Sequence, residues 1–187
     1  MLVSELVLDS KKSRVRIRTF AEGLLARLAH DLELVCSDLS GRASVNERAD
    51  GAQTGSATID VPIAKIAVLG ILHGEHVDEQ GMSASDRSDC LDKMRKDVFH
   101  AGPGAAVHVT VVVEAGAARV RIEPPNGRAV ERTVRPEITE SGGGLRAKGS
   151  IDLSLAAIGS STVKGPMNAF RVKDKVEILF DVTFYPA

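Results

Sequence analysis

Five stretches of the chain alternate apolar and other side chains with a strict period of two. They are Val15–Ile17, Ala57–Ile63, Val107–Val113, Ile151–Leu155 and Val176–Phe184. Because successive side chains of a strand point to opposite faces, each stretch predicts a strand with one apolar and one polar face. One-sided sheets of this kind are antiparallel, and they roll up or pair to bury the apolar face. We therefore expect a mainly β protein, a single antiparallel barrel of roughly eight strands.

Length and charge restrict the domain organisation and the partners. The 187 residues fit one domain spanning residues 1–187, since all-β barrels commonly reach this size without splitting. The 24 lysines and arginines balance the 25 aspartates and glutamates. The chain therefore lacks the basic excess that binding to a phosphate backbone requires, and we expect no nucleic-acid partner.

Cysteine content and the apolar runs indicate the compartment. Two cysteines, Cys36 and Cys90, do not form a disulfide framework. The first residues lack the basic and apolar regions of a signal peptide. The longest apolar stretch, Ile63–Leu72, contains Lys65 and Gly70 and is too short to cross a bilayer. We expect a cytoplasmic protein without stable membrane insertion.

Composition bears on what fills the barrel. Tryptophan is absent and aromatic residues make up 3% of the chain. In a barrel of this size large side chains fill the interior, whereas small ones leave room for a ligand. Small inward residues would leave a ligand cavity, but the composition fits a core packed entirely by aliphatic side chains equally well.

The best predicted helix covers residues 83–99. Ser83 and Asp86 have the spacing of a capping box, and Leu91, Met94 and Val98 form one apolar stripe. We expect this helix to lie across one opening of the barrel. Residues 70–81 are predicted as a loop, and 31–36 with 42–46 as a hairpin.

Few residues suggest chemistry. The pair His30–Asp31 and the pair His73 and His76 lack the further ligands or the spacing of known metal sites. Cys90 has acidic neighbours, which disfavour a reactive thiolate. We therefore predict no catalytic residue, no metal site and no cofactor. Arg87 is a candidate for binding a phosphate or another polar head group at a cavity mouth.

Several segments resemble the YceI-like family, lipocalin-like barrels that bind polyisoprenoids. The segment Leu8–Val15 is similar to the first hairpin of that family, and Phe20–His30 to a segment with its aromatic residue and histidine. In the helix, Arg87 and Leu91 match the family motif, while Ser88 and Cys90 replace its aspartate and histidine. The residues from Gly165 to Tyr185 resemble its last loop and strand.

The resemblance implies a polyisoprenoid, an isoprenoid quinone or a similar lipid inside the barrel. The residues that we predict to contact this ligand are Phe20, His30, Arg87, Leu91, Val109, Val111, Ile151, Leu153, Ile178 and Phe180. One alternative is a non-catalytic barrel that acts through its surface or as a homodimer. The other is a hydrolase or isomerase that uses His30 as a base.

Overall fold

The computed structural model describes residues 2–25, 29–47 and 53–187, and most of them lie in strands. The strands of the first half are β1 (Leu2–Leu8), β2 (Arg14–Thr19), β3 (Ala21–Glu22), β4 (Leu32–Cys36), β5 (Ser40–Glu47), β6 (Gln53–Pro62), β7 (Ile66–His73) and β8 (His76–Asp78). Those of the second half are β9 (Ala106–Glu114), β10 (Ala117–Glu123), β11 (Val130–Val134), β12 (Glu137–Ser141), β13 (Gly144–Ser154), β14 (Arg171–Val172) and β15 (Lys175–Pro186).

Thirteen of the described strands form one curled antiparallel sheet. Eleven of them follow the order β11-β10-β9-β6-β5-β1-β15-β2-β4-β7-β8, while β13 pairs with β15 and β12 pairs with β13. The mainly β, antiparallel barrel is confirmed, but the expected number of about eight strands is too low. Additional short strands come from β8 and from the break at Arg135–Pro136, which separates β11 from β12. Strands β3 and β14 form a separate two-stranded sheet.

Strand β15 joins the two arms of this sheet, which are β11-β10-β9-β6-β5-β1 on one side and β2-β4-β7-β8 on the other. Both arms pair with the same edge of β15. Its residues Phe184–Pro186 pair with β1, whereas Glu177–Asp181 pair with β2. Between the two ladders, the backbone N–H of Thr183 donates to the buried Ser13 hydroxyl over 2.9 Å. The opposite edge of β15 pairs with β13 from Lys175 to Phe184. One strand therefore holds both arms and the next strand of the barrel wall.

The barrel has a seam where β11 approaches β13. Both strands lie wholly in the described part of the chain, and no strand ladder joins them. Instead, Arg132 Nε donates to the carbonyl oxygen of Asp152 over 3.3 Å. A second, polar pocket lies along this seam, and Phe20 borders both this pocket and the interior of the barrel.

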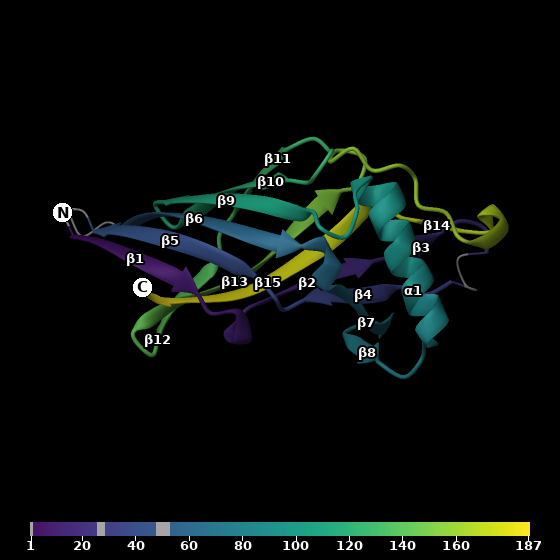
Figure 1. Ribbon diagram of the computed structural model, residues 1–187, viewed down its shortest axis with the longest axis horizontal. Coiled ribbons are helices and arrows are strands. Elements are labelled where there is room, and N and C mark those ends of the chain that lie inside the picture. Colours follow the sequence, from purple (N-terminus) through teal and green to yellow (C-terminus); the bar gives the residue numbers. More distant parts are fainter. Residues whose placement is uncertain (1, 26–28, 48–52) are drawn as a thin grey trace.

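The predicted helix is confirmed as α1 (Ala84–Lys93), which continues as a π-helical segment to Phe99. The Ser83 hydroxyl accepts the Asp86 backbone N–H, as the capping box requires. Figure 1 shows α1 crossing the barrel at the end opposite the two chain termini, with β3 and β14 beyond it. No helix among the described residues has the length and apolar character needed to span a membrane.

Two local expectations are wrong. Strands β4 and β5 do not form a hairpin, because β4 pairs with β2 and β7 whereas β5 pairs with β1 and β6. The segment 70–81 is not a continuous loop, since it contains the end of β7 and the whole of β8. The sequence also predicts a short helical crossing at residues 24–29, and part of this segment lies outside the described residues.

Candidate functional site

An apolar cavity of about 720 Å³ occupies the interior of the barrel. Alternate residues of the strands line it, as the period of two requires. On β15 these are Val176, Ile178, Phe180, Val182 and Phe184. The volume lies within the roughly 300–1,000 Å³ typical of small-molecule sites. The interior is therefore hollow, in contrast to a core packed entirely by aliphatic side chains.

Eight of the ten predicted contact residues line this cavity. They are Phe20, His30, Val109, Val111, Ile151, Leu153, Ile178 and Phe180. The strand residues were found by parity alone, because residues of one face recur at every second position. Contact between these residues and a ligand stays a prediction, while their common location on the cavity wall is a feature of the structure.

Arg87 lies outside the cavity lining, and its guanidinium has other partners. It donates hydrogen bonds to the backbone carbonyl oxygens of Val68, Leu69 and Glu79. These contacts hold the start of α1 against β7 and the segment after β8. The arrangement supports a structural role, and head-group binding by Arg87 stays a prediction.

The cavity-facing side of α1 is rotated slightly from the predicted stripe. Met94 and Val98 line the cavity, but Leu91 packs against the surrounding core instead. Cys90, which precedes Leu91 and lies outside the predicted apolar stripe, lines the cavity in its place. Burial, together with the nearby carboxylates of Asp86 and Asp89, raises the pKa of the Cys90 thiol.

Polar groups gather where the cavity meets α1. Asp86, Asp89 and Lys93 of the helix belong to the lining, as does Lys164 from the loop after β13. Lys93 Nζ donates to the Lys164 backbone carbonyl oxygen over 3.0 Å, which joins helix and loop. Sequence reasoning missed these residues because a tertiary contact over 71 positions leaves no local signal.

His30 borders the same end of the cavity but is exposed to solvent. The adjacent Asp31 carboxylate accepts the backbone N–H of Ala21 over 2.9 Å. This bond fixes the start of β4 beside β3. His73 and His76 lie opposite each other in the β7–β8 hairpin.

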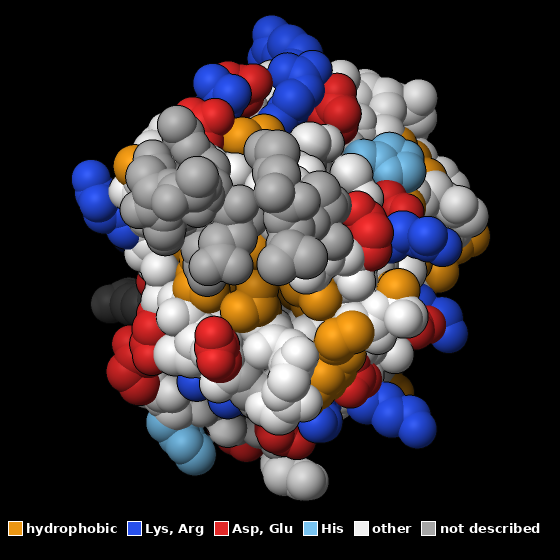
Figure 2. Space-filling model, turned by 90° about the vertical axis from the view of Figure 1, so that its left-hand side faces the viewer, with side chains coloured by type: hydrophobic (Ala, Val, Ile, Leu, Met, Phe, Trp, Pro, Cys, Tyr) orange, Lys and Arg blue, Asp and Glu red, His pale blue; other side chains and the backbone are white. Residues whose placement is uncertain are grey.

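The cavity lining also extends toward the other end of the barrel, with Val45, Val113 and Ile138 among its residues. Figure 2 views this end, which carries the termini. It shows hydrophobic side chains gathered in the middle of the face, with charged side chains around them. The apolar lining therefore runs along most of the barrel's length.

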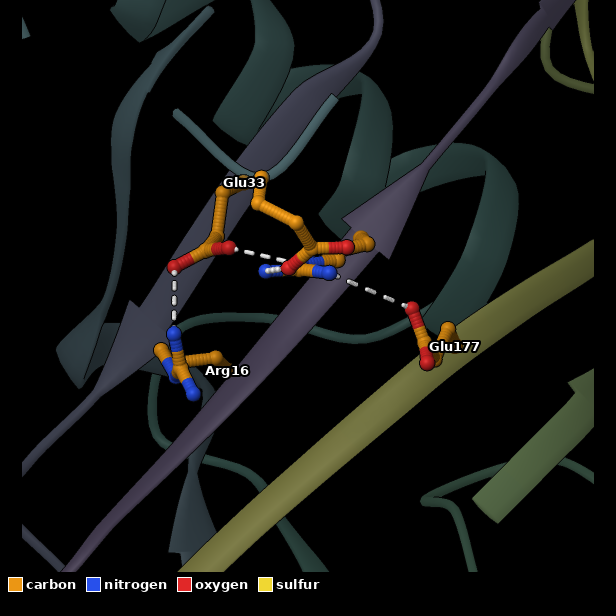
Figure 3. Close-up of polar contacts among 5 residues, drawn as sticks. Arg16, Glu33 and Glu177 are labelled. Carbon is orange, nitrogen blue, oxygen red and sulfur yellow. Dashed lines mark hydrogen bonds and ion pairs between the residues drawn. The ribbon is translucent and has the colours of Figure 1, made fainter. Parts of the chain in front are cut away.

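A buried ion pair lies on the outer face of the barrel wall, where β2, β4 and β15 run side by side. Arg18 is 6% exposed and Glu33 is 1% exposed, and Arg18 Nε lies 2.9 Å from Glu33 Oε2. Glu75 and Glu177 also approach the Arg18 guanidinium, at 2.9 and 3.6 Å. Figure 3 shows Glu33 and Glu177 converging from different strands, with Arg16 on the other oxygen of Glu33. This cluster joins β2, β4 and β15 to the β7–β8 turn.

Two solved structures share this fold. Burkholderia cenocepacia BcnA superimposes with a TM-score of 0.60 at 18% identity, covering 94% of this chain and 98% of that one. A polyisoprenoid binding domain from Saccharophagus degradans, implicated in plant cell wall breakdown, also gives 0.60, at 10% identity and with full coverage of both chains. The YceI-like fold expected from the sequence is therefore confirmed.

No protein-family model and no curated protein matches the sequence. At these low identities the structural likeness establishes the fold alone.

Proposed function

We propose that this YceI-like barrel binds a polyisoprenoid or a similarly long apolar chain in its interior and carries it without changing it chemically. The observation that carries the proposal is the 720 Å³ cavity, whose wall consists mainly of aliphatic and phenylalanine side chains. Charged lining residues are concentrated near α1. The apolar chain would lie along the barrel, with any polar end near Lys93 and Lys164.

The energetics of burial support a ligand of this class. Burying one five-carbon isoprene unit contributes roughly 4 kcal/mol, at about 0.8 kcal/mol per carbon. Several units together exceed the roughly 4–15 kcal/mol that association costs in lost freedom of motion. An extended apolar chain can therefore bind tightly without a charged anchor. The polyisoprenoid-binding function named for the Saccharophagus degradans domain supports the same ligand class.

Native mass spectrometry of the purified protein, followed by organic extraction and lipid identification, tests the proposal. We expect a stoichiometric additional mass that extracts as a polyprenyl or isoprenoid-quinone chain. Protein purified without ligand would next be titrated with a polyprenol and with a palmitoyl lipid of comparable length. Failure to bind either would overturn the proposal and favour a barrel that acts through its surface or as a homodimer.

A further inference from the structure

The end of the molecule beyond α1 exposes large apolar side chains on two neighbouring loops. Leu24 is 99% exposed and Met167 is 97% exposed, while Leu25 is 39% exposed. Single exposed apolar residues are common on protein surfaces. Here, however, the two most exposed large apolar side chains of the described residues, Leu24 and Met167, lie at the same end of the barrel, together with Leu25. We call Leu24, Leu25 and Met167 the apolar tip.

The two loops of the apolar tip are held together by described contacts. Strand β3 pairs with β14 through Glu22 and Arg171, whose side chains also form an ion pair at 2.7 Å. Gly23, which follows β3, lies beside the backbone of Phe170. Leu24 therefore projects from one loop next to the loop that carries Met167. In Figure 1 this sheet lies at the end of the molecule farthest from both termini.

The conformation of the second loop places its two large apolar side chains differently. The Gly165 N–H donates to the Phe170 carbonyl oxygen over 2.9 Å, and the Phe170 ring packs over Gly165. Phe170 lines the cavity, whereas Met167 at the loop's turn is in solvent with a positive φ of 52°. A non-glycine residue adopts this conformation at an energetic cost. The loop thus presents Met167 outward while its base forms part of the cavity wall.

The segments that carry the apolar tip contain more basic than acidic residues. Residues 20–25 and 163–174 contain Lys164, Arg171 and Lys173 against Glu22 and Asp174, and Glu22 is paired with Arg171. Exposed apolar side chains flanked by cations are the surface that binds anionic bilayers, since the apolar groups enter the interface and the cations meet lipid head groups. A protein partner could bind the apolar side chains without the flanking basic residues and without a cavity opening beside them, so a membrane accounts for more of these features.

We propose that the apolar tip docks on an anionic lipid bilayer and places the α1 end of the cavity against the membrane. Docking requires only the surface of the protein and is independent of the proposed lipid binding. Transfer of lipid between the membrane and the barrel would require both docking and the proposed function. Contact is peripheral, because the tip consists of loop side chains.

Co-sedimentation with vesicles tests the docking surface. We expect the protein to bind vesicles of phosphatidylcholine with one quarter phosphatidylglycerol. The double variant Leu24→Ser, Met167→Ser should bind at least tenfold more weakly. Lys164→Glu with Lys173→Glu should reduce binding to anionic vesicles and remove its salt dependence. The matched controls are Val7→Ser, an apolar residue 41% exposed on β1, and Lys11→Glu with Lys148→Glu, and these should bind as the wild type does.

Wild-type protein that does not sediment with anionic vesicles would overturn the proposal, as would tip variants that bind normally while circular dichroism shows them folded. A concentration-dependent dimer that the tip variant abolishes, without vesicle binding, would also overturn it and identify a second copy as the occupant. Mass spectrometry of extracted lipid separates the two proposals. Leu24 and Met167 do not line the cavity, so tip variants should retain bound lipid, whereas vesicle binding without bound lipid would contradict only the proposed function.

Discussion

The two faces of β2, β4 and β15 differ sharply although they belong to the same three strands. Ile178, Ile17 and Leu34 form a row across the strands and line the cavity. One residue along, Glu177, Arg18 and Glu33 form the adjacent row on the outer face.

The difference shows where the specificity of pairing resides. Any aliphatic side chain can occupy the inner row, but the outer row alternates negative, positive and negative across the strands. A slip of one residue would place Arg18 in the cavity and an isoleucine in the charged cluster. The outer row therefore fixes the register, and the inner row provides room for a ligand.

Breaking the outer row should have the largest effect on stability. Replacing Glu33 by glutamine leaves the buried Arg18 guanidinium without its one fully buried carboxylate partner, and loss of one partner of a buried pair typically costs about 3–5 kcal/mol. We expect about 3 kcal/mol here, because Glu75 and Glu177 remain near Arg18. Urea unfolding followed by circular dichroism measures the loss.

The exposed member of the cluster supplies the control for this measurement. Glu75 is 87% exposed, so Glu75→Gln should change the free energy of unfolding far less than Glu33→Gln. Equal losses of unfolding free energy in the two variants would show that burial of the carboxylate does not determine how much each ion pair stabilises the fold.

The inner row is tested by filling the cavity from β9. Val111 lines the cavity, whereas Val112 points to the opposite face. We expect Val111→Trp to weaken polyprenol binding at least tenfold, or about 1.4 kcal/mol, because the indole occupies ligand space. Leu153→Trp should act in the same way. Titration of the folded proteins with a fluorescent polyprenol analogue measures the affinity.

Val112→Trp is the matched control, since it places the same side chain one residue away on the outer face. It should bind polyprenol as the wild type does. If Val112→Trp weakened binding as much as Val111→Trp, this would contradict the prediction that polyprenol binds on the inner face of β9.

Ligand occupancy should also be visible at Cys90. Because burial and nearby carboxylates raise the pKa of its thiol, alkylation at pH 7 should be slow and should accelerate about tenfold per pH unit below that pKa. Bound polyprenol should slow the reaction several-fold by covering the thiol. Mass spectrometry of iodoacetamide-treated protein follows the rate, and fully buried Cys36 serves as the internal reference. An unchanged rate with saturating ligand would contradict binding beside α1.

The smallest effect is expected from acid titration of the outer face. The Arg146 guanidinium, 2.7 Å from Asp181, lowers the pKa of that carboxyl. Stability from this pair is therefore present above the unfolded pKa of about 3.9 and is lost as the pH falls through the lower folded pKa. Asp181→Asn should flatten the decline in unfolding free energy below about pH 4. Urea titrations between pH 2.5 and 6 compare the variant with the wild type, and parallel curves would contradict the role of this pair.

Local patterns predicted the strands and their faces, but not their partners. The period of two located β9, β13 and β15 and assigned Val111, Leu153 and Ile178 to one face. The same reasoning paired β4 with β5, because a short segment with polar residues between two strands is typical of a hairpin. In the structure, Leu39 at this connection is buried in the core, and the chain passes from one arm of the sheet to the other.

The candidate site was predictable to a similar extent. Parity and the capping box found most of the cavity wall and the helix across its end. The sequence could not reveal that Arg87 contacts backbone carbonyl oxygens or that Lys164 joins α1, since these contacts depend on tertiary structure. The sequence shows an arginine at every second position of β2, Arg14, Arg16 and Arg18, but the carboxylate partners of Arg16 and Arg18 come from three distant segments.

The double pairing of β15 has a consequence for biosynthesis. Until residues 175–186 have left the ribosome, β1, β2 and β13 lack their common neighbour, and the arms of the sheet cannot join. Contacts between residues so far apart in sequence make folding slow. Nascent chains therefore carry unprotected apolar strand faces through most of translation, and such species aggregate readily. The strand that joins the two arms of the sheet around the cavity is therefore also the last strand that the growing chain supplies.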